Sequence, residues 1–321
     1  MPTPNLSEII TTTLRNRSGK TADNVSKGNA LSMKLKEKGS WKPATGRTIV
    51  QEVEYAEGNF QWYSGYEEID ISPPDVISAF EFNWKQAAAS VSASGLEIDV
   101  QNTGKEQIID LFEARIKNAE KTLKNNINIG AISNGTGSGG KQLGGLKLLV
   151  ANDPTTGTVG GVDRSLTANI WARNHVYDAS TDGGTAATAT NIQRYMNTLY
   201  LRCTRGADKP DLILADALYY GLFWSSLQAI QRINDPKRGV AGFQSVAFGS
   251  ADVCYEDSTE MPASQMYFLN TDYLFMRYSP KRNFTPLDRV QSINQDAIVQ
   301  LITFAANLTG SNFALQGTLK A

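Results

Sequence analysis

The sequence has 321 residues, of which 41% are hydrophobic and 20% are charged, and its formal net charge is -1. This composition is that of a globular protein that can bury a core, and it excludes a chain that is disordered throughout. The near-zero charge lacks the basic excess of a dedicated nucleic-acid-binding domain, and no run approaches the roughly 18 apolar residues of a membrane-spanning helix.

Residues 1–43 have the composition of an extended arm. They are polar and show little hydrophobic periodicity, so we expect an extended arm with short helical pieces that buries little of itself and is mobile or lies on a partner. This segment carries eight basic residues against three acidic ones, and residues 44–70 carry six acidic residues against one basic residue. Either these are two solvated faces that ignore each other, or the basic arm meets the acidic segment of a neighbouring copy.

Residues 47–84 alternate in the manner of β-strands. Apolar residues share one face and acidic residues point the other way: Ile49, Val53 and Tyr55 against Glu52 and Glu54. A turn signal at 57–59 is followed by a second alternating run, 60–63, which predicts a long two-stranded hairpin. After the prolines at 73 and 74, residues 80–84 alternate again and predict a third strand. A hairpin with this many aromatic residues should cover a surface in the same chain or in another.

Residues 104–130 give the clearest helix prediction. One apolar stripe runs along it at spacings of three and four: Ile108, Phe112, Ile116, Ala119, Leu123 and Ile127. At 1.5 Å per residue the helix would be about 40 Å long, which makes it a scaffold element.

The rest of the chain mixes helices and strands without a βαβ rhythm, which predicts an α+β fold. The expected elements are a glycine-rich loop at 133–145, a short strand at 146–150, loops at 151–188, a helix at 190–205, a strand at 211–215, a helix at 216–233, and from 242 onward short strands and turns that end with strands at 297–304 and 313–319.

Catalytic chemistry is poorly represented. His175 is the one histidine and has no nucleophile motif beside it, so we expect it to be structural. With Cys203 and Cys254 it cannot build a common zinc site, and two thiols cannot form a disulfide framework, which favours synthesis in a reducing cytoplasm. We therefore expect no catalytic, cofactor or metal site.

The glycine-rich loop contains two imitations of phosphate-binding motifs. The segment from Gly135 to Gly140 satisfies GxGxxG, and Gly135 to Gln142 nearly satisfies the Walker A pattern. Both motifs require a strand before the loop and a helix after it. Here the predicted order is the reverse, so a turn that ends the long helix is favoured over a nucleotide site.

The aromatic residues near the hairpin permit two interpretations. They could form a base-stacking platform or a contact with another protein. Their charged neighbours are glutamates, which repel phosphate, so the protein contact is favoured.

The order of elements resembles the major capsid proteins of tailed bacteriophages, which have the Hong Kong 97-type fold. Five stretches resemble that family in their amino-acid sequence and in their order along the chain: 144–146, 159–164 followed by 171–174, 209–213, 268–274 and 307–309. The resemblance implies an N-terminal arm at 1–43, an extended loop and its return strand at 44–95, a peripheral domain with the spine helix at 96–189, an axial domain at 190–280, and C-terminal strands at 281–321 that return to the peripheral domain.

The resemblance also implies a function that is not enzymatic. The chain would assemble in the host cytoplasm into pentamers and hexamers of an icosahedral phage head, with a scaffolding protein, a portal, decoration proteins and non-specifically bound DNA as partners. An encapsulin-like nanocompartment shell is the close alternative, and an enzyme using the loop from Gly135 to Lys141 is the alternative from another class. The candidate subunit-interface residues are Lys36, Lys38, Trp41, Arg47, Glu52, Glu54, Phe60, Trp62, Tyr63 and Tyr66.

Overall fold

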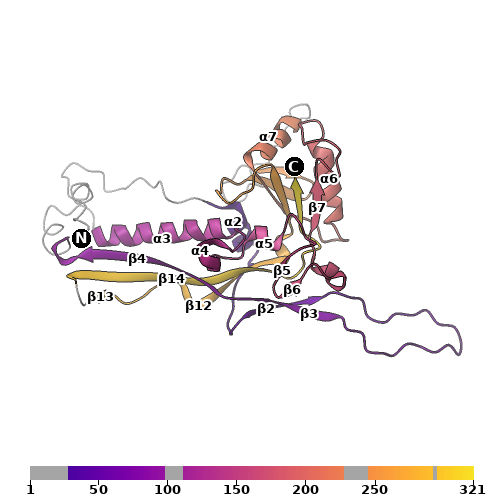
Figure 1. Cartoon of the computed structure of the whole chain (residues 1–321), viewed down its shortest axis with the longest axis horizontal. Coiled ribbons are helices and arrows are strands. Elements are labelled where there is room, and N and C mark those ends of the chain that lie inside the picture. Colours follow the sequence, from indigo (N-terminus) through magenta and orange to yellow (C-terminus); the bar gives the residue numbers. More distant parts are fainter. Residues whose placement is uncertain (1–27, 98–110, 228–244, 292–294) are drawn as a thin grey trace.

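The computed structural model describes residues 28–97, 111–227, 245–291 and 295–321, and statements about structure below refer to these ranges. Figure 1 shows an elongated molecule with two lobes. One lobe is a long sheet with a helix along it, and the other is a compact sheet with two helices. A hairpin leaves the junction of the two lobes and extends far beyond them.

The long lobe is built on a five-stranded sheet. Its central strand, β14 (Ala297–Gly310), pairs antiparallel along one side with β4 (Lys85–Ser94), from Ala297 opposite Ser94 to Ala306 opposite Lys85. On its other side it pairs antiparallel with β12 (Leu274–Pro286) and β13 (Val290–Gln291), and β1 (Trp41–Pro43) adds to β12 in parallel. The strands β12 and β14 have 13 and 14 residues, so the prediction of only short strands after residue 242 is wrong.

Helix α3 (Leu111–Gly130) lies along β4, at the edge of this sheet (Figure 1). Ile116 and Ala119 pack on the buried residues Val91 and Ala93 of β4, and Leu123 and Ile127 enter the main core. Arg115 donates to the carbonyl oxygen of Ser92 on the same strand, over 3.0 Å. The predicted scaffold helix is confirmed over these residues, and its expected first turns at 104–110 lie outside the described ranges.

The compact lobe is a six-stranded sheet in the order β7-β15-β11-β8-β10-β9. The strands are β7 (His175–Asp178), β15 (Gly317–Lys320), β11 (Gln265–Leu269), β8 (Leu212–Ala215), β10 (Ala251–Tyr255) and β9 (Ser245–Phe248). Alternate residues of β8 feed two cores, because Leu212 and Leu214 join the main core while Ile213 and Ala215 pack under helices α6 (Ile192–Arg202) and α7 (Ala217–Ser226). Burial on both faces explains the continuous apolar run.

Part of the predicted arm is folded into the core. Residues 30–37 form helix α2 (Ala30–Glu37), whose N-cap Asn29 accepts from the backbone N–H of Ser32 over 3.0 Å. Ala30, Leu31 and Leu35 are fully buried in the main core. The prediction that this segment buries little of itself is therefore wrong for 28–43, and residues 1–27 lie outside the described ranges.

Two further predictions require correction. Residues 146–149 form a helical turn, α5 (Leu146–Leu149), instead of a strand. Their backbone hydrogen bonds are made within the turn, and the glycines before it allow the chain to reverse. In the C-terminal segment β13 and β14 join the long sheet, but β15 pairs with β7 and β11 in the compact sheet. The compact sheet therefore includes two strands, β7 and β15, from outside the range 190–280 expected for the axial domain. Strand β12 begins inside that range but belongs to the long sheet.

The remaining short elements are α4 (Gly137–Gly140), β5 (Thr158–Val159), β6 (Val162–Asp163), η3 (Thr167–Ala172) and η5 (Thr271–Tyr273). Among the described residues, no helix is both long and apolar enough to cross a membrane.

Candidate functional site

The hairpin that leaves the junction of the lobes is formed by β2 (Ile49–Glu54) and β3 (Ile77–Phe82). Six residue pairs join them, from Ile49 opposite Phe82 to Glu54 opposite Ile77. The predicted hairpin is therefore correct in its first strand and wrong in its second, because residues 60–63 do not pair with 49–54. The predicted third strand is the true partner.

The inner face of this hairpin rests on the body of the protein. Phe80 and Phe82 are buried, whereas Glu52 and Glu54 point outward and are exposed, as the alternation predicts. At the end of the ladder the N–H of Tyr55 donates to the carbonyl oxygen of Val76 over 3.0 Å. Burial, together with a hydrogen bond to the carboxylate of Asp75, raises the pKa of the Tyr55 phenol above its ordinary value.

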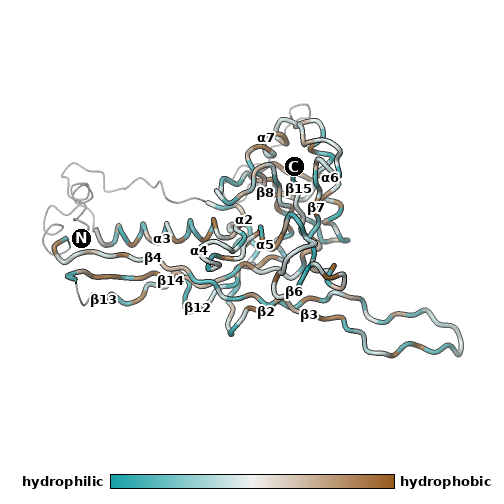
Figure 2. The backbone as a smooth tube through the Cα atoms, in the orientation of Figure 1, coloured by the Kyte–Doolittle hydropathy of each residue, from teal (hydrophilic) through white to brown (hydrophobic). Residues whose placement is uncertain are grey.

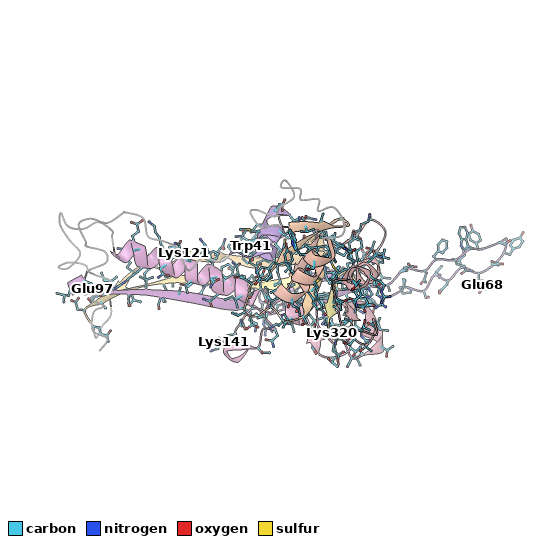
Figure 3. All side chains as sticks on the ribbon, turned by 90° about the horizontal axis from the view of Figure 1, so that it is seen from above. Trp41, Glu68, Glu97, Lys121, Lys141 and Lys320 are labelled. Atoms are coloured by element: carbon cyan, nitrogen blue, oxygen red, sulfur yellow. The ribbon has the colours of Figure 1, made fainter. Side chains whose placement is uncertain are left out.

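We call residues 56–75, beyond this point, the projecting loop. Its two arms run side by side away from the body, and Figure 3 shows Glu68 at its far end. The arms are held to each other by side-chain amides: Asn59 Nδ2 donates to the Ser72 carbonyl over 2.6 Å, and Gln61 Nε2 donates to the Glu68 carbonyl over 3.1 Å. The chain turns at Gly65, whose φ of +60° favours glycine.

The projecting loop exposes its aromatic side chains almost completely. The exposed fractions of Phe60, Trp62, Tyr63 and Tyr66 are 76%, 87%, 63% and 106%. Apolar residues alternate with polar ones along the loop in Figure 2, and Ile71 is 91% exposed. Such an apolar surface, with no covering element from the described part of its own chain, is typical of a surface that another molecule covers.

The loop and its hairpin are also acidic. Between Arg47 and Lys85 the sequence has eight acidic residues and no basic one. Hydrogen bonds from the hydroxyl and N–H of Ser72 lower the pKa of Asp70, so this carboxylate stays ionised. The surface therefore favours a protein partner with basic side chains and disfavours phosphate.

The other candidate residues lie elsewhere. Lys38 forms ion pairs within its own chain, at 3.1 Å to Asp211 and 2.8 Å to Asp272. Trp41 packs on Phe304 with ring centroids 6.5 Å apart, and the ammonium of Lys36 lies 4.8 Å from the centroid of the Trp41 ring. Arg47 is exposed just before β2. The structure thus groups Phe60, Trp62, Tyr63 and Tyr66 in one surface and leaves Lys36, Lys38 and Trp41 apart from it.

The histidine and the two cysteines lie in the compact lobe, away from the projecting loop. Burial and the charge of Arg202 lower the pKa of His175, which lies in β7. Burial raises the pKa values of Cys203 and Cys254 to about 12, which leaves both thiols protonated and unreactive at neutral pH. Within the described ranges, no group of three or more metal-ligating side chains comes together.

The glycine-rich loop does not have the setting of a phosphate site. Helix α3 precedes it and the four-residue helical turn α5 follows it, so no strand leads into the loop. The ammonium of Lys85 donates to the carbonyl oxygen of Gly140, which ties the loop to the start of β4. The loop reverses the direction of the chain after α3.

Sequence reasoning missed the residues that support the hairpin. Trp171 stacks on Tyr55, with ring centroids 5.1 Å apart and an interplanar angle of 29°, and also contacts Phe80 at 5.2 Å. Arg164 is 2% exposed and reaches the carbonyl oxygen of Ala172 beside Trp171. The available signal was a tryptophan and an arginine in an otherwise polar, loop-rich segment.

No protein-family model matches the sequence, and no curated protein matches it. Solved structures do match over nearly the whole chain. The capsid asymmetric unit of cyanophage A-1(L) is 14% identical, with a TM-score of 0.67, and the match covers 96% of each chain. The capsid of the empty GTA particle is 14% identical, with a TM-score of 0.60, covering 97% of this chain and 96% of that one.

A shell of another kind has the same arrangement. The holo-SrpI encapsulin of Synechococcus elongatus is 9% identical, with a TM-score of 0.56, and the match covers 100% of this chain and 96% of that one. The chain therefore has the α+β Hong Kong 97-type fold, and the prediction of this fold from the sequence is confirmed.

Proposed function

We propose that this chain is a major capsid protein that assembles into an icosahedral phage head around double-stranded DNA. The observation that carries the proposal is the match of 96% of the chain to a cyanophage capsid subunit of nearly equal extent. The projecting loop supports it, because a loop with four exposed aromatic residues needs a partner and identical copies would supply one.

Assembly would proceed through repeated weak contacts. The loop would lie across a neighbouring subunit and bury Phe60, Trp62 and Tyr63, which are 63% to 87% exposed in the single chain. Buried aromatic anchors contribute most of the energy of such interfaces, whereas each exposed ion pair contributes about 0–1 kcal/mol. Many copies in a closed lattice make these small terms count together.

The partners follow from this role. Pentamers and hexamers would form first, with a scaffolding protein to direct closure, a portal at one vertex and decoration proteins outside. A net charge of -1 suits an inner face that must hold DNA only weakly. The protein would be made in the host cytoplasm and end in the virion, without enzymatic activity.

A nanocompartment shell that encloses cargo protein is the second candidate, favoured by the full-length match to the encapsulin. The phage head remains preferred because the TM-score is 0.67 for the cyanophage capsid against 0.56 for the encapsulin. Particles purified from the native source should be treated with nuclease and then opened. Protected double-stranded DNA supports the phage head, and a single abundant cargo protein without DNA supports the nanocompartment.

The enzyme alternative has a separate test. A nucleotide-binding loop from Gly135 to Lys141 would show heat of ATP or NAD binding in calorimetry, and Lys141→Ala would abolish it. We expect no binding heat for the parent chain or for Lys141→Ala, because no strand leads into this loop.

A further inference from the structure

The projecting loop is joined to the body only through its hairpin. Apart from the bond between the Tyr55 phenol and the Asp75 carboxylate at the root of the loop, the hydrogen bonds that the described structure gives to residues 56–75 stay within the loop itself. The six-pair ladder of β2 and β3 must therefore transmit the direction of the loop, and an isolated two-stranded ladder is marginal and twists easily. Something in the body has to hold the ladder in one orientation.

The support under the hairpin is residues 157–173, which include β5, β6 and η3, and we call this segment the pedestal. Trp171 of the pedestal lies against Tyr55, the residue that follows β2, and against Phe80 of β3, with ring centroids 5.1 Å and 5.2 Å away. The N–H of Glu81 donates to the carbonyl oxygen of Gly160 over 2.8 Å. One aromatic stack thus fixes the outer end of the ladder, and one backbone hydrogen bond fixes β3 near the inner end.

Gly160 allows the close approach of the pedestal to β3. Its φ is +53°, and a Cβ atom placed there would lie 2.7 Å from the Cβ of Phe80. Only glycine lets the two backbones meet at this distance without displacement. The neighbouring Gly161 also has a positive φ, of +80°, but an added Cβ would meet nothing within 4 Å.

The pedestal itself is held by Arg164. This residue is 2% exposed, and its guanidinium donates to three carbonyl oxygens, those of Ala172 at 3.1 Å, Leu148 at 3.3 Å and Leu149. Burial lowers the pKa of Arg164 to about 10, so it is still charged at neutral pH. A buried cation is costly to place, and here it crosslinks η3 to α5 through their carbonyl groups.

The contacts close into a ring. Arg164 lies 5.2 Å from the centroid of the Phe313 ring, and Phe313 meets Phe80 edge-on at 4.9 Å. Phe80 contacts Trp171, and the residue after Trp171 accepts from Arg164. The pedestal and the hairpin therefore form one packed unit, and tilting the hairpin would break several of its contacts at once.

We propose that the pedestal sets the direction in which the projecting loop leaves the subunit, with Trp171 as the positioning residue on which the hairpin rests and Arg164 as the residue that holds Trp171 in place. The consequence for shell closure rests on the proposed function, but the positioning role does not. The projecting loop is long, because ten extended residues from Tyr55 to the turn at Gly65 span about 33 Å. A tilt of about 10° at its root would therefore move its tip by about 6 Å. Apolar contacts require heavy atoms within about 4–4.5 Å, so such a tilt would separate the aromatic residues from their target.

The direction of the loop can be measured without assembly. Spin labels would be attached at Ser64→Cys in the loop and at Asn197→Cys on α6, with labelled chains diluted into unlabelled ones. The native Cys203 and Cys254 are fully buried and should not react. Double electron–electron resonance should give one narrow distance distribution for the parent chain, and Trp171→Ala should widen it at least twofold.

Matched variants separate positioning from general damage. Trp171→Phe retains a ring for the stack and should keep the distribution narrow. Trp62→Ala, in the loop itself, should also keep it narrow. If Trp171→Ala does not unfold cooperatively, Tyr55→Ala removes the same stack from the hairpin side and should give the same widening. A distribution that is already broad in the parent chain, or that stays narrow in a folded Trp171→Ala or Tyr55→Ala chain, overturns the proposal.

Shell assembly of the same variants separates this inference from the proposed function. Trp171→Ala should widen the distance distribution and reduce closed particles, whereas Trp62→Ala should reduce closed particles with an unchanged distribution. If the parent chain forms no particles but the distance results hold, the proposed function fails and the positioning role of Trp171 stands.

Discussion

Lys34 and Asp252 form a largely buried ion pair between α2 and β10. The Nζ and Oδ2 atoms are 3.2 Å apart, and the two side chains are only 13% and 15% exposed. A second lysine of this segment, Lys38, also pairs with carboxylates of its own chain. At these two positions the basic charge of the N-terminal segment is used within the subunit, beside the compact sheet.

Replacing Lys34 should therefore destabilise the folded subunit. Lys34→Ala leaves the Asp252 carboxylate without its cation, and a lost hydrogen bond to a charged group costs about 1.5–3 kcal/mol. Urea unfolding followed by circular dichroism would measure the change in the free energy of unfolding. The control is Lys141→Ala at an exposed loop position, which should stay within about 0.5 kcal/mol of the parent. Equal effects of the two substitutions would contradict the structural role of the pair.

The ion pairs of Lys38 predict a dependence on alkaline pH. Burial alone would lower the pKa of its ammonium, but the hydrogen bonds and charges of Asp272 and Asp211 outweigh burial and raise the pKa above 10.5. A raised folded-state pKa contributes stability that is complete below the unfolded-state value and is lost as pH rises through the folded-state value. The stability advantage of the parent over Lys38→Gln should thus be constant from about pH 8 to 10 and shrink above about pH 10.5. An advantage that grows as the pH rises would contradict this assignment.

The two neighbouring glycines of the pedestal should differ in their tolerance of alanine. Gly161→Ala meets only the backbone cost of a left-handed conformation, about 1–2 kcal/mol. Gly160→Ala meets that cost and also a Cβ placed 2.7 Å from the Cβ of Phe80, which adds about 1–3 kcal/mol of overpacking. Thermal unfolding of both variants would rank them, and equal midpoints would contradict the close approach at Gly160.

The sequence predicted those elements whose pattern is long or unambiguous. The stripe Ile116, Ala119, Leu123 and Ile127 repeats over enough turns to exclude a strand, and α3 is found there. Helix α2 has only one turn and a half of apolar residues among lysines, so its local pattern is too short to stand out from an arm. Its burial depends on contacts with β8 and β12, which are more than 170 residues away in the sequence.

The partner of β2 could not be chosen from local pattern. Residues 60–63 and 77–82 alternate equally well, and period-two alternation does not say which strand pairs with which. The choice is made by Phe80, which is buried against Phe313 and Trp171, while Phe60 and Trp62 find no cover in the described chain. The sequence predicted that the hairpin aromatics would cover a surface in the same chain or in another, and in the structure Phe60 and Trp62 contact each other edge-on at 5.2 Å and remain exposed.

The loop aromatics should matter for assembly and not for the fold. Trp62 is 87% exposed, so Trp62→Ala should change the free energy of unfolding of the subunit by less than about 0.5 kcal/mol. As a buried anchor in the assembled state, the same side chain should contribute about 2 kcal/mol or more per contact. Light scattering against protein concentration should show the onset of assembly at a concentration at least tenfold higher. An unchanged onset would contradict the role of Trp62 in the interface.

The central claim is that copies of this chain close into shells through the projecting loop. The most direct measurement is negative-stain electron microscopy of two purified proteins, the parent and a variant in which residues 57–74 are replaced by an Asn-Gly turn, each with its scaffolding protein. Tyr55 and Val76 already pair at the loop root, so the shortened hairpin should close and the subunit should unfold cooperatively as the parent does. The account predicts closed particles of uniform size for the parent and only folded subunits or open capsomers for the variant. A parent that stays monomeric, or a variant that still closes uniform shells, would contradict it.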